Sequence, residues 1–174
     1  HVRDGAMAYL RQQYKVVFQV FIIVTVLFAI MAYVLKIQNP WVPFAFLTGG
    51  FFSGLAGFFG MRTATYASAR TANAAQRSLN DGLRIAFRSG AVMGLVVVGL
   101  GLLDISIWFY ALQFIIGSLD STTNGIIAAD PSMKLIIITT TTLTFGMGAS
   151  TQALFARVGG GIFTKAADVG ADLV

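Results

Sequence analysis

The sequence has no cysteine, no glutamate and a single histidine, and only 11% of its 174 residues are charged. Without cysteine there is no disulfide framework and no thiolate metal site in these residues. One imidazole, at position 1, cannot form a histidine cluster for zinc, and nothing here suggests a Ser–His–Asp triad. Soluble domains carry about a quarter charged residues. The chain is therefore not an ordinary soluble domain.

Apolar sequence takes the place of the missing charge, with 56% hydrophobic residues. It forms four long runs, at residues 16–35, 41–61, 89–116 and 135–156. The first run has twenty residues without a charge, which as a helix matches the roughly 30 Å hydrocarbon core of a bilayer. A signal peptide would have a shorter apolar region followed by a small-residue cleavage site. The sequence predicts an all-α membrane protein, a polytopic transmembrane helix bundle with about four spans.

Basic residues alternate between the two sides that four spans would create. Ten of the twelve lysines and arginines lie in residues 1–15, 62–88 and 157–174, which four spans place on one side. The positive-inside bias makes that side cytoplasmic and explains the net charge of +5 without a nucleic-acid partner. The segment 62–88 also lacks the interleaved aromatics of a nucleic-acid surface, so we interpret it as helical extensions of the flanking spans joined by a cytoplasmic turn.

The last segment, residues 157–174, gathers charge next to apolar sequence. Steps of four, four, three and four connect Arg157, Gly161, Lys165, Asp168 and Asp172, so a helix would place them on one stripe. Two aspartates one turn apart repel each other by a few tenths of a kcal/mol unless a cation lies between them. Mg²⁺ binds such carboxylate oxygens and can bind phosphate oxygens at the same time. The lysine of the stripe would then contact that phosphate as a point charge. A simple lysine–aspartate ion pair is the alternative that the residues leave open.

Other polar or small residues in the apolar runs have simpler interpretations. Glycine and serine spaced four apart, as in Gly50 with Gly54 and Gly90 with Gly94, favour helix packing. We expect the threonines around 139–144 to bond to their own helix backbone, although some could line an ion path. Asp104 interrupts the third run near its far end, which makes a functional role the less favoured interpretation.

Glycine and proline mark the remaining irregular places. Three consecutive glycines, 159–161, are costly in a helix, and we expect a neighbouring helix or a ligand to approach them closely. A tight turn is predicted at residues 36–41. A loop after the third run is predicted from Asp120, Asn124, Gly125, Asp130 and Pro131.

Three stretches resemble one known family. The run RVGGGIFTKAADVGADLV, residues 157–174, closely resembles the signature of the membrane-integral, ion-pumping inorganic pyrophosphatases. The segment MRTATYASARTANAA followed by AFRSGAVMG is similar to an early loop and helix of that family, and GAMAYLRQQYK looks like its entry into the second helix. The resemblance implies that the chain is an N-terminal fragment carrying the second to fifth of about sixteen helices.

The resemblance also implies roles for the stripe. Lys165 matches a lysine that contacts pyrophosphate, and Asp168 and Asp172 match aspartates that hold Mg²⁺ bridged to it. Arg157 matches an arginine at the place where hydrolysis is coupled to the ion path. Phe163 stands where tyrosine is common, a conservative departure. The implied water-activating aspartates lie outside these residues, so no catalytic residue is assigned within them and the segment alone is not expected to be active.

The implied function is Mg²⁺-dependent pyrophosphate hydrolysis that drives H⁺ or Na⁺ across a membrane, with the choice of ion and any K⁺ dependence left open. The implied protein is a multi-pass homodimer in a prokaryotic inner membrane, with its site on the cytoplasmic side. The chain, residues 1–174, would be a single transmembrane segment of that larger pump. A small four-span membrane protein with a structural or assembly role is the alternative, and a passive channel comes third.

Overall fold

The computed structural model describes residues 2–122 and 131–172, and these residues form four long helices with no strand. Helix α1 spans Val2–Ala29, α2 spans Val42–Ala75, α3 spans Leu79–Thr122 and α4 spans Pro131–Asp172. One π-helical turn, Ile30–Val34, directly follows α1. The predicted all-α fold is confirmed.

The chain turns between α1 and α2 where the sequence predicted a tight turn. Lys36 has a φ of 52°, the left-handed conformation that ends the helical path. The side-chain oxygen of Asn39 accepts a hydrogen bond from the Trp41 N–H at 3.1 Å, which closes the turn. Pro43 lies in the first turn of α2, where its missing N–H costs no helical hydrogen bond. Local turn chemistry thus fixes where the second helix begins.

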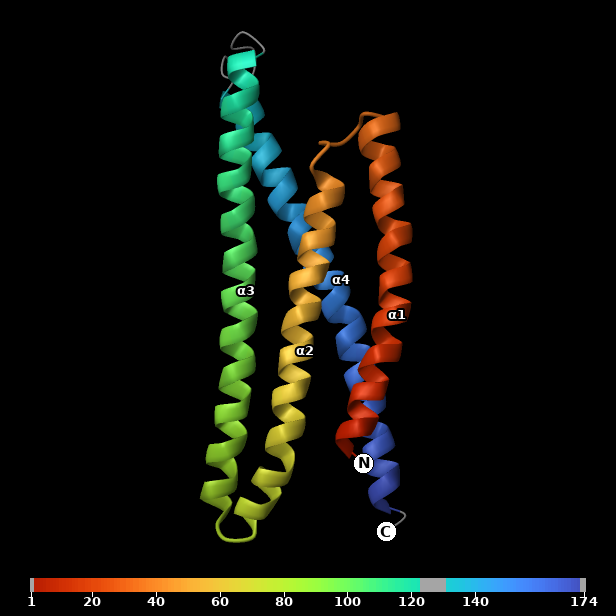
Figure 1. The fold of residues 1–174 in the computed structure, drawn as a ribbon, viewed down its shortest axis with the longest axis vertical. Helices are drawn as coiled ribbons and strands as arrows, with labels where there is room; N and C mark the ends of the chain where they lie inside the picture. Colours follow the sequence, from red (N-terminus) through yellow and green to blue (C-terminus); the bar gives the residue numbers. More distant parts are fainter. Residues whose placement is uncertain (1, 123–130, 173–174) are drawn as a thin grey trace.

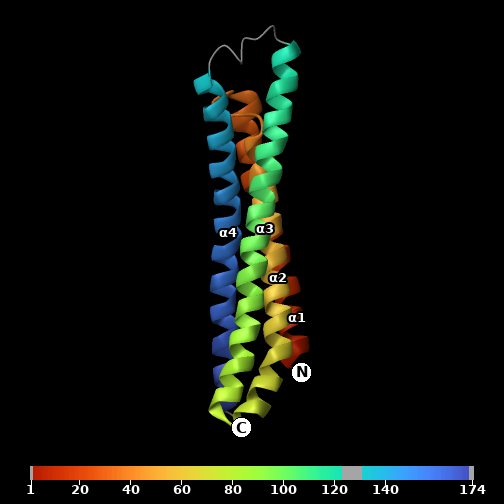
Figure 2. The same ribbon diagram turned by 90° about the vertical axis from the view of Figure 1, so that its left-hand side faces the viewer.

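The helices run alternately up and down, and α2 contacts each of the other three (Figures 1 and 2). Helix α4 crosses behind α2 in Figure 1, so that it lies near α3 at one end and near α1 at the other. The described start of α1, the turn between α2 and α3, and the described end of α4 all lie at the same end of the bundle (Figure 1). This is the arrangement expected from the alternation of basic residues along the sequence.

Large apolar side chains cover the outside of the bundle. Phe18, Ile23, Leu95 and Phe114 are all more than 60% exposed, the reverse of a soluble protein. Three helical stretches, Asp4–Val34, Val42–Ala75 and Leu79–Ile115, are long and apolar enough to cross a membrane. The described part of the chain is therefore a membrane-type bundle.

The fourth predicted span, residues 135–156, lies in α4. This helix is as long as the others but is not among the three stretches that meet both the length and the apolarity of a membrane span in the described residues. Its threonines and glycines reduce its hydropathy, although it packs along α2 over much of its length. That α4 crosses the membrane stays a prediction.

Two small clusters form the buried core, one on each side of α2. Ala45, Trp108, Leu112 and Phe145 join α2 to α3 and α4. Val17, Phe21 and Phe46 join α1 to α2, and the rings of the last two stack with their centroids 4.8 Å apart. The core therefore depends on α2, which explains why that helix positions the others.

Glycines allow α2 and α4 to approach one another closely. A Cβ on Gly148 would collide with the backbone of Phe46, and one on Gly49 would collide with the Phe145 carbonyl. The Ser53 hydroxyl donates to the Ala149 carbonyl across the same contact, at 3.1 Å. Helices in a membrane commonly associate in this way, through small residues and hydroxyl groups, because the hydrophobic effect does not drive them together in lipid.

Several expectations about helix ends can be compared with the structure. The basic segment 62–88 is helical on both sides of a short turn, because α2 continues to Ala75 and α3 begins at Leu79.

The glycine pair at 90 and 94, by contrast, has no described atom within 4 Å of an added Cβ, so it mediates no packing among the described residues.

The predicted loop after the third run falls largely outside the described residues. Asn124, Gly125 and Asp130 lie there, whereas Asp120 belongs to α3 and Pro131 begins α4.

Candidate functional site

The charged stripe predicted from the sequence occupies the last four turns of α4. The helix continues without a break to Asp172, so all five stripe positions lie on one helical face. The four charged members, Arg157, Lys165, Asp168 and Asp172, are exposed. Each turn of the helix thus presents a charge, or at Gly161 an open position, to the same side.

Lys165 and Asp168 form an ion pair on this stripe. The lysine Nζ lies 3.4 Å from the Asp168 Oδ2, and the two side chains are 84% and 57% exposed. Exposed pairs of this kind contribute less than about 1 kcal/mol. The ion-pair interpretation that the sequence left open is therefore realised, yet the pair is weak enough for both groups to exchange partners for a ligand.

The two aspartates supply the oxygen chemistry of a hard-cation site. The described residues contain no group of three or more His, Cys, Asp or Glu side chains that could hold a metal ion. Residues 2–122 and 131–172 alone therefore supply no complete cage of protein ligands for a metal ion. Mg²⁺ fits this donor set better than Ca²⁺ does, because it is commonly held by one or two carboxylates, several waters and substrate phosphate oxygens.

The glycine run 159–161, whose last member belongs to the stripe, is explained at one of its three positions. Gly159 is buried, and a Cβ there would collide with the Tyr9 hydroxyl and lie 2.8 Å from the Gln13 side-chain nitrogen of α1. Added Cβ atoms at Gly160 and Gly161 would meet nothing within 4 Å. The expected close approach of a neighbouring helix is therefore confirmed at Gly159 alone.

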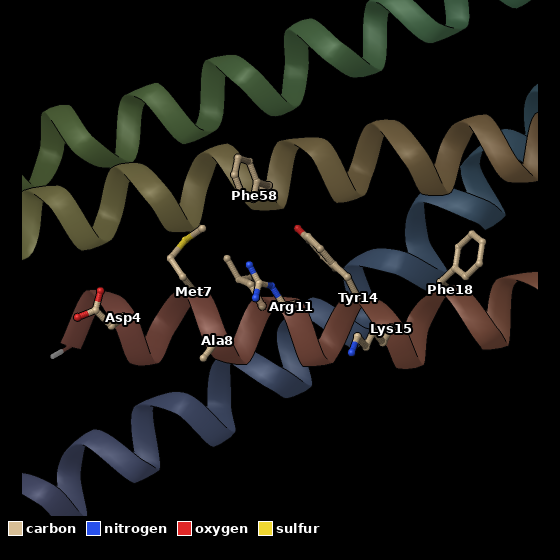
Figure 3. A pocket seen from close by; sticks show the side chains of 9 residues that line it. Asp4, Met7, Ala8, Arg11, Tyr14, Lys15, Phe18 and Phe58 are labelled. Carbon is tan, nitrogen blue, oxygen red and sulfur yellow. The ribbon is translucent and has the colours of Figure 1, made fainter.

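Helix α1 also carries two cations close to this end of the bundle. Figure 3 shows the groove between α1 and α2, where Arg11 and Lys15 lie one turn apart beside apolar side chains. Tyr14 points from α1 toward α2 in the same view, and its hydroxyl donates to the Gly54 carbonyl at 2.7 Å. Phe58 of α2 forms the opposite wall. Polar groups of α1 thus attach it to α2 here, as they do to α4.

Asp104 is a second acidic site, and its environment differs completely from the stripe. Its side chain is only 1% exposed, and neither carboxylate oxygen has a hydrogen-bond partner among the described residues. The Thr48 hydroxyl faces it, but that hydroxyl donates to the Ala45 carbonyl at 3.2 Å and accepts from Trp108 Nε1 at 2.7 Å. Its position near the far interface stays a prediction, and its burial inside the bundle was not predicted from the sequence.

Comparison with known proteins identifies the family. A family model described as inorganic H⁺ pyrophosphatase matches residues 1–174. The chain belongs to this family. It is 71% identical, over 99% of its length, to a Bacteroides thetaiotaomicron protein that bears the name of a K⁺-stimulated pyrophosphate-energized sodium pump. It is 43% identical, also over 99%, to a K⁺-insensitive pyrophosphate-energized proton pump of Moorella thermoacetica.

The chain spans 22% of the length of each of these two relatives. No solved structure matches the chain. Family membership confirms the resemblance drawn from the stripe and the two earlier segments, and it does not favour the small structural or assembly protein that was the alternative.

The threonine-rich part of α4 bonds mainly to its own helix backbone. Thr140, Thr141, Thr142 and Thr144 each donate to the carbonyl four residues earlier, at 2.8 Å. This agrees with the expectation that such hydroxyls satisfy the helix backbone. Whether any of these threonines lines an ion path stays a prediction.

Sequence reasoning missed the α1 side chains that contact α4. Tyr9 and Gln13 lie in the basic segment 1–15, and the sequence around them gives no sign of their contacts because their partners are more than 140 residues away. The one available signal was the run of three glycines, which indicated a close neighbour without naming it.

Proposed function

We propose that the chain is part of a pyrophosphate-energised ion pump, in which hydrolysis of Mg²⁺-bound pyrophosphate drives H⁺ or Na⁺ across a membrane. The observation that carries the proposal is the match of the whole chain to the inorganic H⁺ pyrophosphatase family, together with an exposed Lys–Asp–Asp stripe at the end of one long helix. Hydrolysis itself requires groups from the remainder of the pump.

Each stripe residue has a role that its chemistry suits. Lys165 would bind a phosphate oxygen, at a small cost because its ion pair with Asp168 is exposed. Asp168 and Asp172, one turn apart, would hold Mg²⁺ shared with pyrophosphate. When bound, this ion would neutralise and polarise the phosphate oxygens.

Arg157 lies on the same face, eight residues before Lys165, which in a helix is about 12 Å nearer the membrane portion of α4. It is the cation of the stripe best placed to link the phosphate-binding end to an ion path. Its side chain is exposed and makes no ion pair within the described residues. We assign it to coupling rather than to phosphate binding.

The names of the relatives favour Na⁺ as the transported ion and K⁺ as an activator. The relative at 71% identity and another at 46%, from Clostridium tetani, are both named as K⁺-stimulated sodium pumps. The relatives named as proton pumps are 37% to 43% identical. The basic residues gathered in segments at one end of the bundle support a cytoplasmic position for the stripe, and a prokaryotic inner membrane is part of the same proposal. A homodimer is part of the same proposal and rests on family resemblance alone.

Phosphate release by membranes that carry the complete polypeptide tests this function. Wild type is expected to release phosphate from pyrophosphate only when Mg²⁺ is present, and more rapidly with K⁺. Asp168→Asn should abolish release, whereas Asp81→Asn, an exposed carboxylate at the same end of the bundle, should leave it unchanged. Correctly inserted wild type that releases no phosphate would refute the proposal.

A further inference from the structure

One face of α4 is held by two side chains of α1. Gln13 Nε2 donates to the Phe155 carbonyl at 2.7 Å, a contact between residues 142 apart in sequence. In a regular α-helix this carbonyl also accepts the N–H of residue 159. The amide therefore bonds directly to the hydrogen-bond ladder of α4, where the glycine run begins.

Tyr9 continues the same contact toward the end of the helix. Its hydroxyl fills the space that a Cβ on Gly159 would occupy, and its ring lies 6.2 Å, centroid to centroid, from the ring of Phe163. Phe155, Gly159 and Phe163 are spaced four apart, so they form one face of α4. Helix α1 thus contacts three successive turns of that face.

The contacted face is opposite to the charged stripe. Arg157 follows Phe155 by two positions, and Gly161 follows Gly159 by two. Two positions correspond to a rotation of about 200° around an α-helix with 3.6 residues per turn. A contact on the back of a helix determines which way its front points. The α1 contact therefore sets the direction in which Lys165 and Asp168 project.

The helix is locally weak within this contacted stretch, between Gly159 and Phe163. Gly160 and Gly161 carry no side chain, an added Cβ at either would meet nothing within 4 Å, and each costs about 1 kcal/mol relative to alanine in a helix. Such a segment is conformationally permissive, so by itself it does little to fix the direction or rotation of the helix end. Its orientation has to come from the neighbouring helix.

We propose that Gln13 and Tyr9 are positioning residues for the pyrophosphate site, which orient the end of α4 from behind through Phe155 and Gly159. This rests on the proposed function, because it assigns Lys165 and Asp168 to pyrophosphate and Mg²⁺. The two α1 side chains touch no substrate. They act by fixing the register of the helix that carries the ligands.

The test uses Gln13→Leu in the complete polypeptide, which removes the amide donor while keeping a similar side-chain volume. Asn39→Leu is the matched control, because the Asn39 amide also donates to an α4 carbonyl, that of Ile137 at 3.4 Å, at the opposite end of the helix. Gly159→Ala is a second variant, which inserts one methyl group into the contact. All three are compared with wild type for thermal stability.

The first readout is binding without turnover, measured as protection against trypsin by Mg²⁺ and imidodiphosphate, a non-hydrolysed pyrophosphate analogue. We expect Gln13→Leu and Gly159→Ala to raise the half-protective concentration about tenfold, since displacements of about 1 Å in a binding site have effects of this size or larger. Asn39→Leu should leave it within twofold, even where it lowers the Tm equally. The KM for pyrophosphate should rise in parallel.

Two outcomes would overturn the inference while leaving the function intact. In one, Gln13→Leu and Gly159→Ala protect and hydrolyse like wild type. In the other, Asn39→Leu weakens binding as much as Gln13→Leu, which would show a general loss of packing. Failure of wild type itself to bind imidodiphosphate or to hydrolyse pyrophosphate would instead refute the proposed function, and the positioning role with it.

Discussion

Asp104 and Asp168 place the same side chain in opposite environments within one chain. Asp104 is 1% exposed, between α2 and α3, and no described group donates a hydrogen bond to it. Asp168 is 57% exposed at the end of α4 and pairs with a lysine. Burial of an unpaired carboxylate costs stability, whereas an exposed pair contributes almost none. Asp104 therefore lowers the stability of the fold, whereas Asp168 has little effect on stability and is accessible to a ligand.

The largest expected effect comes from substitution of the exposed aspartate, Asp168. Asp168→Asn should lower Mg²⁺-dependent pyrophosphate hydrolysis at least about hundredfold, the size of effect seen when one electrostatic ligand is removed from an active site. The melting temperature should hardly change, because an exposed ion pair is all that is lost from the fold. Hydrolysis and thermal unfolding of the same membrane preparation give both values. A large fall in melting temperature would contradict the view that Asp168 contributes little to the stability of the fold.

Packing between the two sites is the next place to perturb. Gly148→Ala should destabilise the bundle by about 2 kcal/mol, because its methyl group would collide with the Phe46 backbone, which cannot move aside as a flexible side chain could. Gly146→Ala, two residues earlier on α4, is the control, since an added Cβ there meets nothing within 4 Å. Unfolding in detergent compares the two, and equal stabilities would show that α2 and α4 do not pack as described.

The buried side of the comparison predicts a stabilising change. Asp104→Asn keeps the shape of the side chain, removes the charge and supplies an N–H₂ donor, so we expect unfolding to become harder by about 1 kcal/mol. Asp81→Asn, which removes an exposed carboxylate from the first turn of α3, should instead lower stability slightly, because that charge interacts favourably with the helix dipole. A clear loss of stability in Asp104→Asn would show that the carboxylate has a partner elsewhere in the complete protein.

The contrast between the two aspartates also shows what sequence could predict. The stripe was found because helical spacing depends only on positions within one segment, and α4 is continuous over it. The burial of Asp104 was not found, because it depends on α2 meeting α3 at that depth, where Thr48 of α2 faces the carboxylate and accepts a hydrogen bond from Trp108 of α3. In the same way, the glycines at 90 and 94 show the pattern of a packing face, yet an added Cβ there meets no described atom within 4 Å, whereas one at Gly49 or Gly148 meets a neighbouring helix.

The smallest expected effect concerns the ion pair of the stripe itself. A double-mutant cycle with Lys165→Met and Asp168→Asn should give a coupling energy for unfolding below about 0.5 kcal/mol, falling further at high salt. The same cycle measured on pyrophosphate binding should show strong non-additivity, because residues that hold one ligand act as a unit. Weak coupling in folding combined with strong coupling in binding would mean that these two charges are arranged for the ligand. A folding coupling above about 2 kcal/mol would instead show that the complete pump buries the pair, and the stripe would then resemble the environment of Asp104.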